Sequence, residues 1–190
     1  MREWTVAGVA GHKDRDVVVA YVAIEALNAW ALFSRSFYLS CALGALTERK
    51  KIVVTTSTPD PLGAAITCFS SRARPNAQGF WHRRDEPPWH DPNVLMKVCG
   101  NLGCSIRVQI GNAFSLSQNV FNDLPVFRNF FAHRNGQTSQ AAQNVAPRYM
   151  LPTHLSPTEL LLSVSPGATE RVILEWLTEM LITAEFLCKA

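Results

Sequence analysis

Apolar side chains recur at three- and four-residue steps over the first long stretch of the chain, residues 14–46. A helix brings residues with this spacing onto one face, and no proline interrupts the stretch, so the pattern predicts one long helix. Glu25 and Arg35 interrupt its apolar run. A membrane-spanning helix needs about 20 mostly apolar residues, so we expect a buried core helix here. Its apolar stripe comprises Val19, Ala23, Ala26, Trp30, Phe33 and Phe37.

Helical patterns return later in the chain, at 61–71, 93–104 and 117–135 and beyond residue 156. Ser156 to Glu159 reads as a capping box with proline at the first helical position. Ser165-Pro166 is expected to start the last helix, with Glu175 and Glu179 opposite its apolar stripe. These patterns predict an all-α bundle of four to five main helices in one domain, 1–190. We expect the long first and last helices to pack antiparallel.

Three other segments interrupt the helical pattern. The runs 52–56 and 106–110 are β-like, and either they pair as a minor hairpin-like patch or one of them belongs to a helix. The tract 136–143, rich in Gln, Ser and Thr, is predicted to be a loop. Residues 72–92 hold four prolines, four arginines and two tryptophans, a composition typical of a long irregular loop.

Charge and cysteine content say little about the partners and the cellular location of the protein. The formal net charge of +3 gives no overall basic field that would indicate a nucleic-acid partner. The five cysteines are scattered, and the near pair Cys99 and Cys104 lacks zinc-knuckle spacing. Residues 1–16 contain no apolar core of a secretory signal. We therefore expect a cytoplasmic protein with free thiols, without cofactor, metal or membrane partner.

The clearest candidates for catalysis or binding lie between 127 and 135, in the run Phe-Arg-Asn-Phe-Phe-Ala-His-Arg-Asn. Asp123 is predicted to cap the helix that carries this run, with Pro125 at its second position and Gly136 at its end. Asn129 and His133 are four residues apart and share a face, so Asn129 could hydrogen-bond the imidazole. Arg128 lies about 140° around the helix axis from His133.

This run resembles the signature of the HEPN superfamily, in which an arginine is followed after four to six residues by a histidine. Asn, Asp or His often follows the arginine directly, and Arg128, Asn129 and His133 match all three positions. The chain length, the predicted helical bundle and the place of the motif on a late helix are similar too. The first helix looks like that of several such proteins, through Asn28, Trp30, Arg35 and Tyr38.

HEPN proteins with this motif are typically metal-independent endoribonucleases that dimerise, so that two motifs face one cleft. The resemblance implies that His133 is general base or acid for the attacking ribose 2′-hydroxyl, while Arg128 stabilises the phosphorane charge. It implies RNA as substrate, a homodimer, and a toxin–antitoxin or phage-defence setting with an antitoxin or other defence protein as partner. A toxin branch has tyrosine where this chain has Asn135, which puts that branch in doubt.

Two other functions compete with catalysis. A non-catalytic HEPN module could bind RNA or nucleotide, or act as a dimeric adaptor, and it would also keep Arg128. In a purely structural bundle, Arg128 and His133 would only complement the dipole at a helix end. The presence of both residues favours the enzyme, because binding alone has little need of a histidine near neutral pH.

Further RNA-binding candidates lie outside the motif and its Arg134. Asn28 and Arg35, seven residues apart on one helix face, either line the same cleft as His133 or satisfy buried backbone groups. Arg83 and Arg84 belong to the irregular stretch 72–92, whose tryptophans could stack on bases or pack on the bundle as a surface lid. His82, His90 and Asp91 have no diagnostic metal-ligand spacing.

Overall fold

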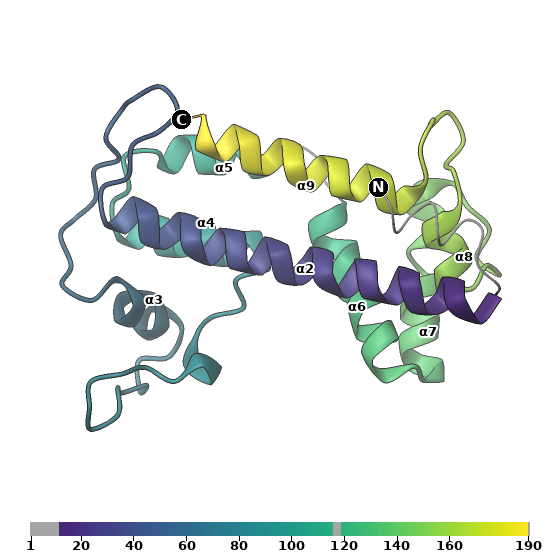
Figure 1. Ribbon diagram of the computed structural model, residues 1–190, viewed down its shortest axis with the longest axis horizontal. Coiled ribbons are helices and arrows are strands. Elements are labelled where there is room, and N and C mark those ends of the chain that lie inside the picture. The colour runs from purple at the N-terminus through teal and green to yellow at the C-terminus, as the bar shows by residue number, and fades with distance from the viewer. Residues whose placement is uncertain (1–11, 116–118, 190) are drawn as a thin grey trace. The chain divides into compact units, whose positions relative to one another are not determined.

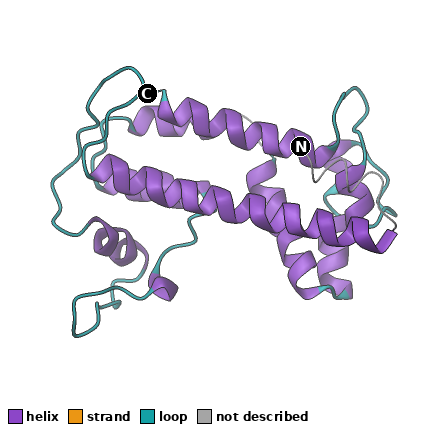
Figure 2. Ribbon diagram, viewed as in Figure 1, coloured by secondary structure: helices purple, strands orange, loops and turns teal. Residues whose placement is uncertain are grey.

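The computed structural model describes residues 12–115 and 119–189, which fold into helices joined by loops (Figures 1 and 2). The all-α prediction is confirmed for this described part of the chain. Residues 1–11, most of the stretch predicted to lack a secretory signal, lie outside the described residues. The α-helices are α2 (His12–Ala42), α3 (Pro61–Phe69), α4 (Pro92–Asn101), α5 (Arg107–Ser115), α6 (Val120–His133), α7 (Gly136–Gln143), α8 (Pro157–Leu162) and α9 (Val172–Cys188).

The described residues form two compact units. Unit 1 contains residues 12–29 and 119–181, and unit 2 contains 30–115 and 182–189. Helices α2 and α9 each begin in unit 1 and end in unit 2. The chain therefore passes through the units in the same order along both helices, so the expected antiparallel direction is wrong. Helix α9 follows α8 along the chain, and α8 lies in unit 1. Helix α9 therefore begins in the same unit as α2.

Helix α2 contributes to the core of each unit. Val19 and Ala23 are buried in unit 1, and Trp30 and Tyr38 are buried in unit 2. Among the described helices, α2 is also long and apolar enough to cross a membrane by length and composition. Core helices of globular proteins pass the same test. Helix α2 is buried along one face, whereas Val17, Tyr21 and Leu32 on it are exposed.

The core of unit 1 gathers the apolar faces of α6, α8 and α9. Phe127 of α6 and Trp176 of α9 pack edge to face with ring centroids 5.3 Å apart. Leu160, Leu161 and Ile173 are fully buried in the same unit. Helix α8 begins with the predicted capping box, in which Ser156 Oγ accepts from the Glu159 N–H and the Glu159 carboxylate from the Ser156 N–H.

The tract 136–143 is helix α7, and the prediction of a loop there is wrong. Asn135 ends the preceding turn and caps α7, since its side-chain oxygen accepts from the Thr138 N–H at 2.9 Å. The Thr138 hydroxyl oxygen accepts from the Asn135 N–H in return. This reciprocal capping box satisfies helix-end groups that a polar tract would otherwise leave to water.

Two predicted helix starts are also wrong. Asp123 does not cap α6, because the helix begins at Val120 and the Asp123 side chain is buried within it. Helix α9 begins at Val172 instead of Ser165-Pro166. Gly167 takes a left-handed φ of 86°, and an antiparallel bridge joins Val164 to Arg171. The chain therefore reverses before the helix can start.

In unit 2 the two β-like runs do not pair as a hairpin. Residues 107–115 form α5, since Ile106, Ile110 and Ala113 also match helical spacing and the last two are buried. Ile52 instead makes an isolated antiparallel bridge with Leu46. The segment 52–56 is held to the residues before α5 by hydrogen bonds. The Ser105 N–H donates to the Val54 carbonyl at 2.9 Å and the Thr56 N–H to the Leu102 carbonyl at 2.8 Å.

The stretch from 72 to 91 contains only a short 3-10 turn, Arg83–Asp85, and is fastened to the helices by polar contacts. Trp81 Nε1 donates to the Asp60 carboxylate at 2.7 Å, and Asp60 also caps α3 through the Gly63 N–H. Trp89 is buried, with its ring centroid 5.4 Å from that of Tyr38. Both tryptophans are thus engaged within unit 2, as in the surface-lid interpretation.

Candidate functional site

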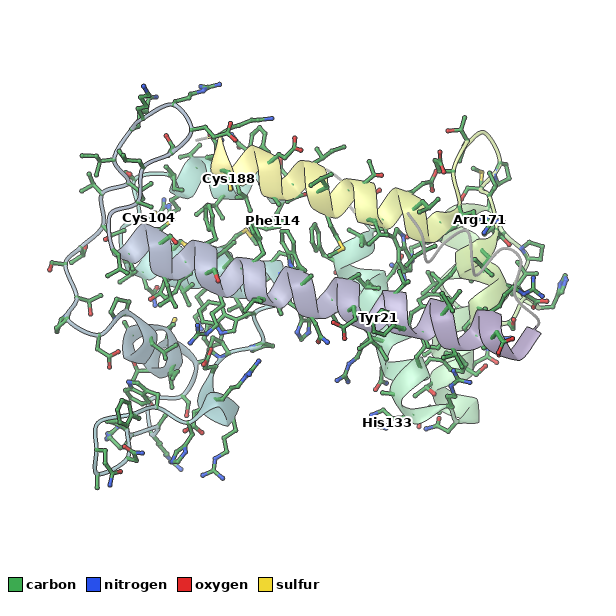
Figure 3. All side chains as sticks on the ribbon, viewed as in Figure 1. Tyr21, Cys104, Phe114, His133, Arg171 and Cys188 are labelled. Atoms are coloured by element: carbon green, nitrogen blue, oxygen red, sulfur yellow. The ribbon has the colours of Figure 1, made fainter. Side chains whose placement is uncertain are left out.

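The predicted Arg/His motif lies on the last two turns of α6 in unit 1. Phe127 and Phe131 are buried and hold this helix against its unit, whereas Arg128, Asn129 and His133 are exposed. The alternation follows from helical geometry, because residues four apart share a face. Figure 3 shows His133 at the C-terminal end of α6. The polar residues of the motif are therefore open to a substrate.

The end of α6 is a tight joint that fixes the residues after His133. Arg134 adopts a left-handed conformation, with φ 38° and ψ 55°, and its N–H donates to the Phe130 carbonyl at 2.7 Å. Its guanidinium carbon lies 5.9 Å from the centre of the Phe131 ring. Asn135 then caps α7. The cation of Arg134 is thus held beside the motif, exposed and next to His133 in sequence.

The motif side chains are not fixed by other parts of the chain. Among the residues that the structure describes, no hydrogen bond or ion pair engages the side chains of Arg128, Asn129 or His133. Asn129 and His133 share an exposed face one turn apart, as predicted, so an amide–imidazole contact is sterically accessible. The imidazole and the guanidinium can therefore reach a bound phosphodiester or a second protein chain.

The start of α6 carries a buried polar network that lies outside the sequence motif. The Asp123 carboxylate accepts from Tyr149 Oη at 2.8 Å and faces Arg148 Nη2 at 2.8 Å. Tyr149 Oη in turn accepts from Trp176 Nε1 at 2.7 Å. Burial raises the pKa of Asp123 above its ordinary value, against the opposing effects of Tyr149 and Arg148. This network fastens α6 to two other segments of unit 1.

A second carboxyl, that of Glu179 on α9, lies at the same end of α6. Burial raises the pKa of Glu179, a hydrogen bond from the Val120 N–H lowers it, and the charges of Glu175 and Asp123 raise it again. Glu179 therefore faces the positive end of the α6 dipole instead of solvent. The sequence contained one signal of this network, an acidic residue among the buried Phe121, Leu124 and Phe127.

Asn28 and Arg35, predicted to contact RNA, both have partners within the chain. The Asn28 amide donates to the Glu25 carboxylate at 3.2 Å in unit 1. In unit 2, Arg35 donates through Nε and Nη2 to the two oxygens of Glu86, at 2.6 and 3.2 Å. Trp89 Nε1 also donates to Glu86. Arg35 therefore anchors the 72–91 stretch, and its contact with RNA stays a prediction.

Burial raises the pKa of Glu86, but hydrogen bonds from Arg35 and Trp89 and the charges of Arg35 and Arg83 outweigh it and lower the pKa. The anchor is therefore an ion pair near neutral pH. Arg83 and Arg84 themselves are exposed in the 3-10 turn of unit 2. Among the described residues, no group of three His, Cys, Asp or Glu side chains has an arrangement that could hold a metal ion.

Replacing Arg83 and Arg84 together with alanine is expected to weaken RNA binding and flatten its salt dependence. Each phosphate contact to a single strand contributes about 0.7 to the slope of log K against log salt, so the slope should fall by about 1.4. Lys50→Ala with Lys51→Ala removes the same charge elsewhere in unit 2 and serves as the control. Equal slopes for the two double variants would assign the effect to net charge alone.

Comparison of the chain with protein-family models, curated proteins and solved structures finds no match.

Proposed function

We propose that the protein is a metal-independent endoribonuclease of HEPN type, whose active site is assembled from the α6 motifs of two copies. The observation that carries this proposal is the exposure of Arg128, Asn129 and His133 at the end of a helix whose other face is buried. Exposed cationic and imidazole groups on a rigid support are suited to phosphodiester chemistry.

In the proposed reaction, the neutral imidazole of His133 removes the proton of a ribose 2′-hydroxyl. The 2′-oxygen attacks the adjacent phosphorus, and the bond from phosphorus to the 5′-oxygen of the next nucleotide breaks. The departing oxygen takes a proton from an imidazolium, which leaves a 2′,3′-cyclic phosphate and a 5′-hydroxyl. Arg128 donates to the phosphorane oxygens through its planar fork. Asn129 would orient the imidazole through a hydrogen bond that forms when the substrate binds.

A homodimer would supply what one copy lacks. Arg128 and His133 diverge by about 140° around an ideal helix, so one copy places them poorly on a single phosphate. A two-fold axis beside α6 would bring a second pair to the same substrate. Unit 1 also exposes Val17 and Tyr21, one turn apart on α2, an apolar surface suited to contact with another chain.

The alternative is a non-catalytic module that binds RNA or nucleotide, or acts as a dimeric adaptor. One observation favours it: no described residue orients the His133 imidazole, although catalytic bases are usually held by a third group. We expect the protein in the cytoplasm, in a toxin–antitoxin or phage-defence system. That expectation rests on the motif's resemblance to the family.

Incubation of the wild-type protein with total RNA in the presence of a chelator should yield fragments with 2′,3′-cyclic phosphate ends. Arg128→Ala should lose most of this activity, and Arg128→Lys should recover only part, since a point charge lacks the bidentate fork. A mixture of Arg128→Ala and His133→Ala proteins should be more active than either alone, because a mixed dimer holds one intact group of each kind.

Mapping of fragment ends by ligation and sequencing provides the measurement. A protein that binds RNA but yields no cyclic-phosphate ends would favour the adaptor. Cleavage by a protein that stays monomeric in sedimentation would contradict the shared site.

A further inference from the structure

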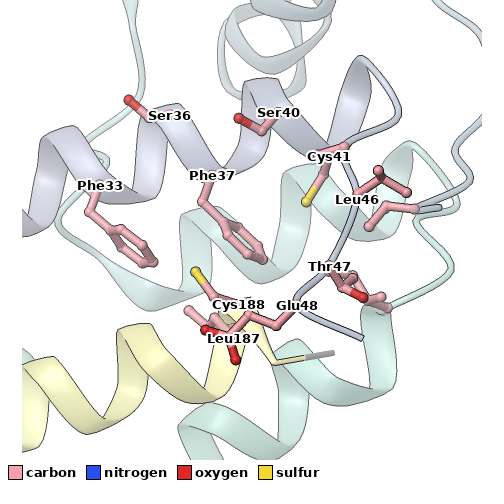
Figure 4. Close-up of a pocket in the computed structure, with 13 residues that line it drawn as sticks. Phe33, Ser36, Phe37, Ser40, Cys41, Leu46, Thr47, Glu48, Leu187 and Cys188 are labelled. Carbon is pink, nitrogen blue, oxygen red and sulfur yellow. The ribbon is translucent and has the colours of Figure 1, made fainter. Parts of the chain in front are cut away.

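Unit 2 contains a cavity of about 360 Å³ that is separate from the motif (Figure 4). Four parts of the unit line it: the last turns of α2, the segment 45–53 that follows this helix, the residue before α5, and the end of α9. Its apolar surface includes the rings of Phe33 and Phe37 and the side chains of Val53, Ile106 and Leu187. The volume lies in the range of small-molecule sites, about 300–1,000 Å³.

The cavity interior is uncharged. The sulfur atoms of Cys41 and Cys188 face the two phenylalanine rings, and the hydroxyls of Ser36 and Ser40 point away from those rings (Figure 4). A hydrogen bond to Cys104 and burial raise the pKa of Cys41, and burial and the charge of Glu48 raise that of Cys188. Both thiols are therefore protonated near neutral pH and behave as apolar groups.

One carboxylate stands at the edge of this apolar space. Glu48 is the charged residue among those that line the cavity, and its side chain is exposed. Its backbone N–H donates to the Cys188 carbonyl at 3.2 Å, which holds this part of the turn against the end of α9. A ligand with an apolar body in the cavity would present its solvent-facing end to a negative charge.

The volume also limits the size of the occupant. One water occupies about 30 Å³ in the liquid, so the cavity corresponds to about twelve waters and to a molecule of about ten to twelve non-hydrogen atoms. We propose that this cavity binds a small amphipathic amine, with its apolar body between Phe33, Phe37 and Leu187 and its ammonium group beside Glu48. This site lies outside the proposed RNA chemistry and does not depend on it.

The test compares three probes of equal chain length, decylamine, 1-decanol and decanoate, by calorimetric titration of the full chain below their aggregation concentrations. Decylamine is expected to bind about three- to fivefold more tightly than decanol, the usual strength of one exposed charge pair, and decanoate more weakly. Glu48→Gln should remove the preference for decylamine and leave decanol binding unchanged. Glu185→Gln, which removes one charge on α9 outside the cavity lining, is the control.

A second measurement locates the ligand. Decylamine should slow the alkylation of Cys188 by iodoacetamide and leave that of Cys68, a thiol outside the cavity, unchanged. Cys188→Phe should fill the cavity and lower the affinity for decylamine at least tenfold. The proposal is overturned by equal affinities for the ammonium and the alcohol, by loss of the preference in Glu185→Gln, by equal protection of both thiols, or by no binding of any probe.

Discussion

Replacement of His133 with alanine is expected to lower the rate of RNA cleavage by about 10² to 10⁴, the usual contribution of a positioned acid–base group. The loss should appear in single-turnover experiments with saturating protein, because the change removes the proton acceptor and leaves the cationic groups that hold the phosphate. RNA affinity should therefore change much less than rate. Cleavage by the wild-type protein should persist in chelator.

The matched control for this variant is His154→Ala, which removes an exposed histidine from the same unit. It should cleave at the wild-type rate. Both variants should fold like the wild type. His133 is exposed in a last helical turn, where a residue contributes at most about 1–2 kcal/mol, and His154 is exposed in a turn outside the helices. Equal loss of activity in the two histidine variants would contradict a catalytic role of His133.

Replacement of Asp123 with alanine is expected to lower the free energy of unfolding by about 2–3 kcal/mol. The change leaves the buried Tyr149 hydroxyl without its acceptor, and an unsatisfied buried donor costs about 1–3 kcal/mol. It also leaves a small cavity beneath α6. Arg148 loses its counter-ion, but its side chain is 46% exposed and water can solvate it. Urea unfolding followed by circular dichroism gives the measurement.

The conservative variant Asp123→Asn should separate packing from charge. Because burial raises the pKa of Asp123 in the folded protein, its stabilising contribution is full below its ordinary pKa and is lost as pH rises through the folded value. Wild-type stability should therefore fall more steeply with rising pH, from about pH 4 upward, than that of Asp123→Asn. A steeper fall in Asp123→Asn would contradict a raised pKa of Asp123 in the folded protein. The pKa of Glu179 is also raised, so Glu179 also makes stability fall with rising pH, but it is present in both proteins and does not affect their difference.

Sequence patterns that depend on neighbouring residues predicted the helices and helix starts that such residues determine. The capping box at Ser156 is present, and the predicted stripe along α2 is buried from Val19 to Trp30, while Phe33 and Phe37 are half-buried. Helix α7 was missed because Gln, Ser and Thr report polarity but not a helix start, which the Asn135–Thr138 exchange supplies. The alternation at 106–110 was ambiguous, because Ile106 and Ile110 fit both periodicities.

The partners of buried polar groups could not be predicted, because they are distant in sequence. Asp123 pairs with Tyr149 and Arg35 with Glu86, separations of 26 and 51 residues. A local pattern shows that such a group needs a partner but cannot say which one. The exposed motif was easier to place, because Phe127 and Phe131 fix the buried face of α6 and leave Arg128, Asn129 and His133 on the outside.

The division of α2 and α9 between the two units has a consequence for synthesis of the chain. Each unit combines segments from α2 and from α9, so neither core can close before α9 has been synthesised. Ile173 and Trp176 of α9 complete one core, and Leu187 of the same helix completes the other. Such non-local closure slows folding, and the apolar stripe of α2 stays uncovered longest.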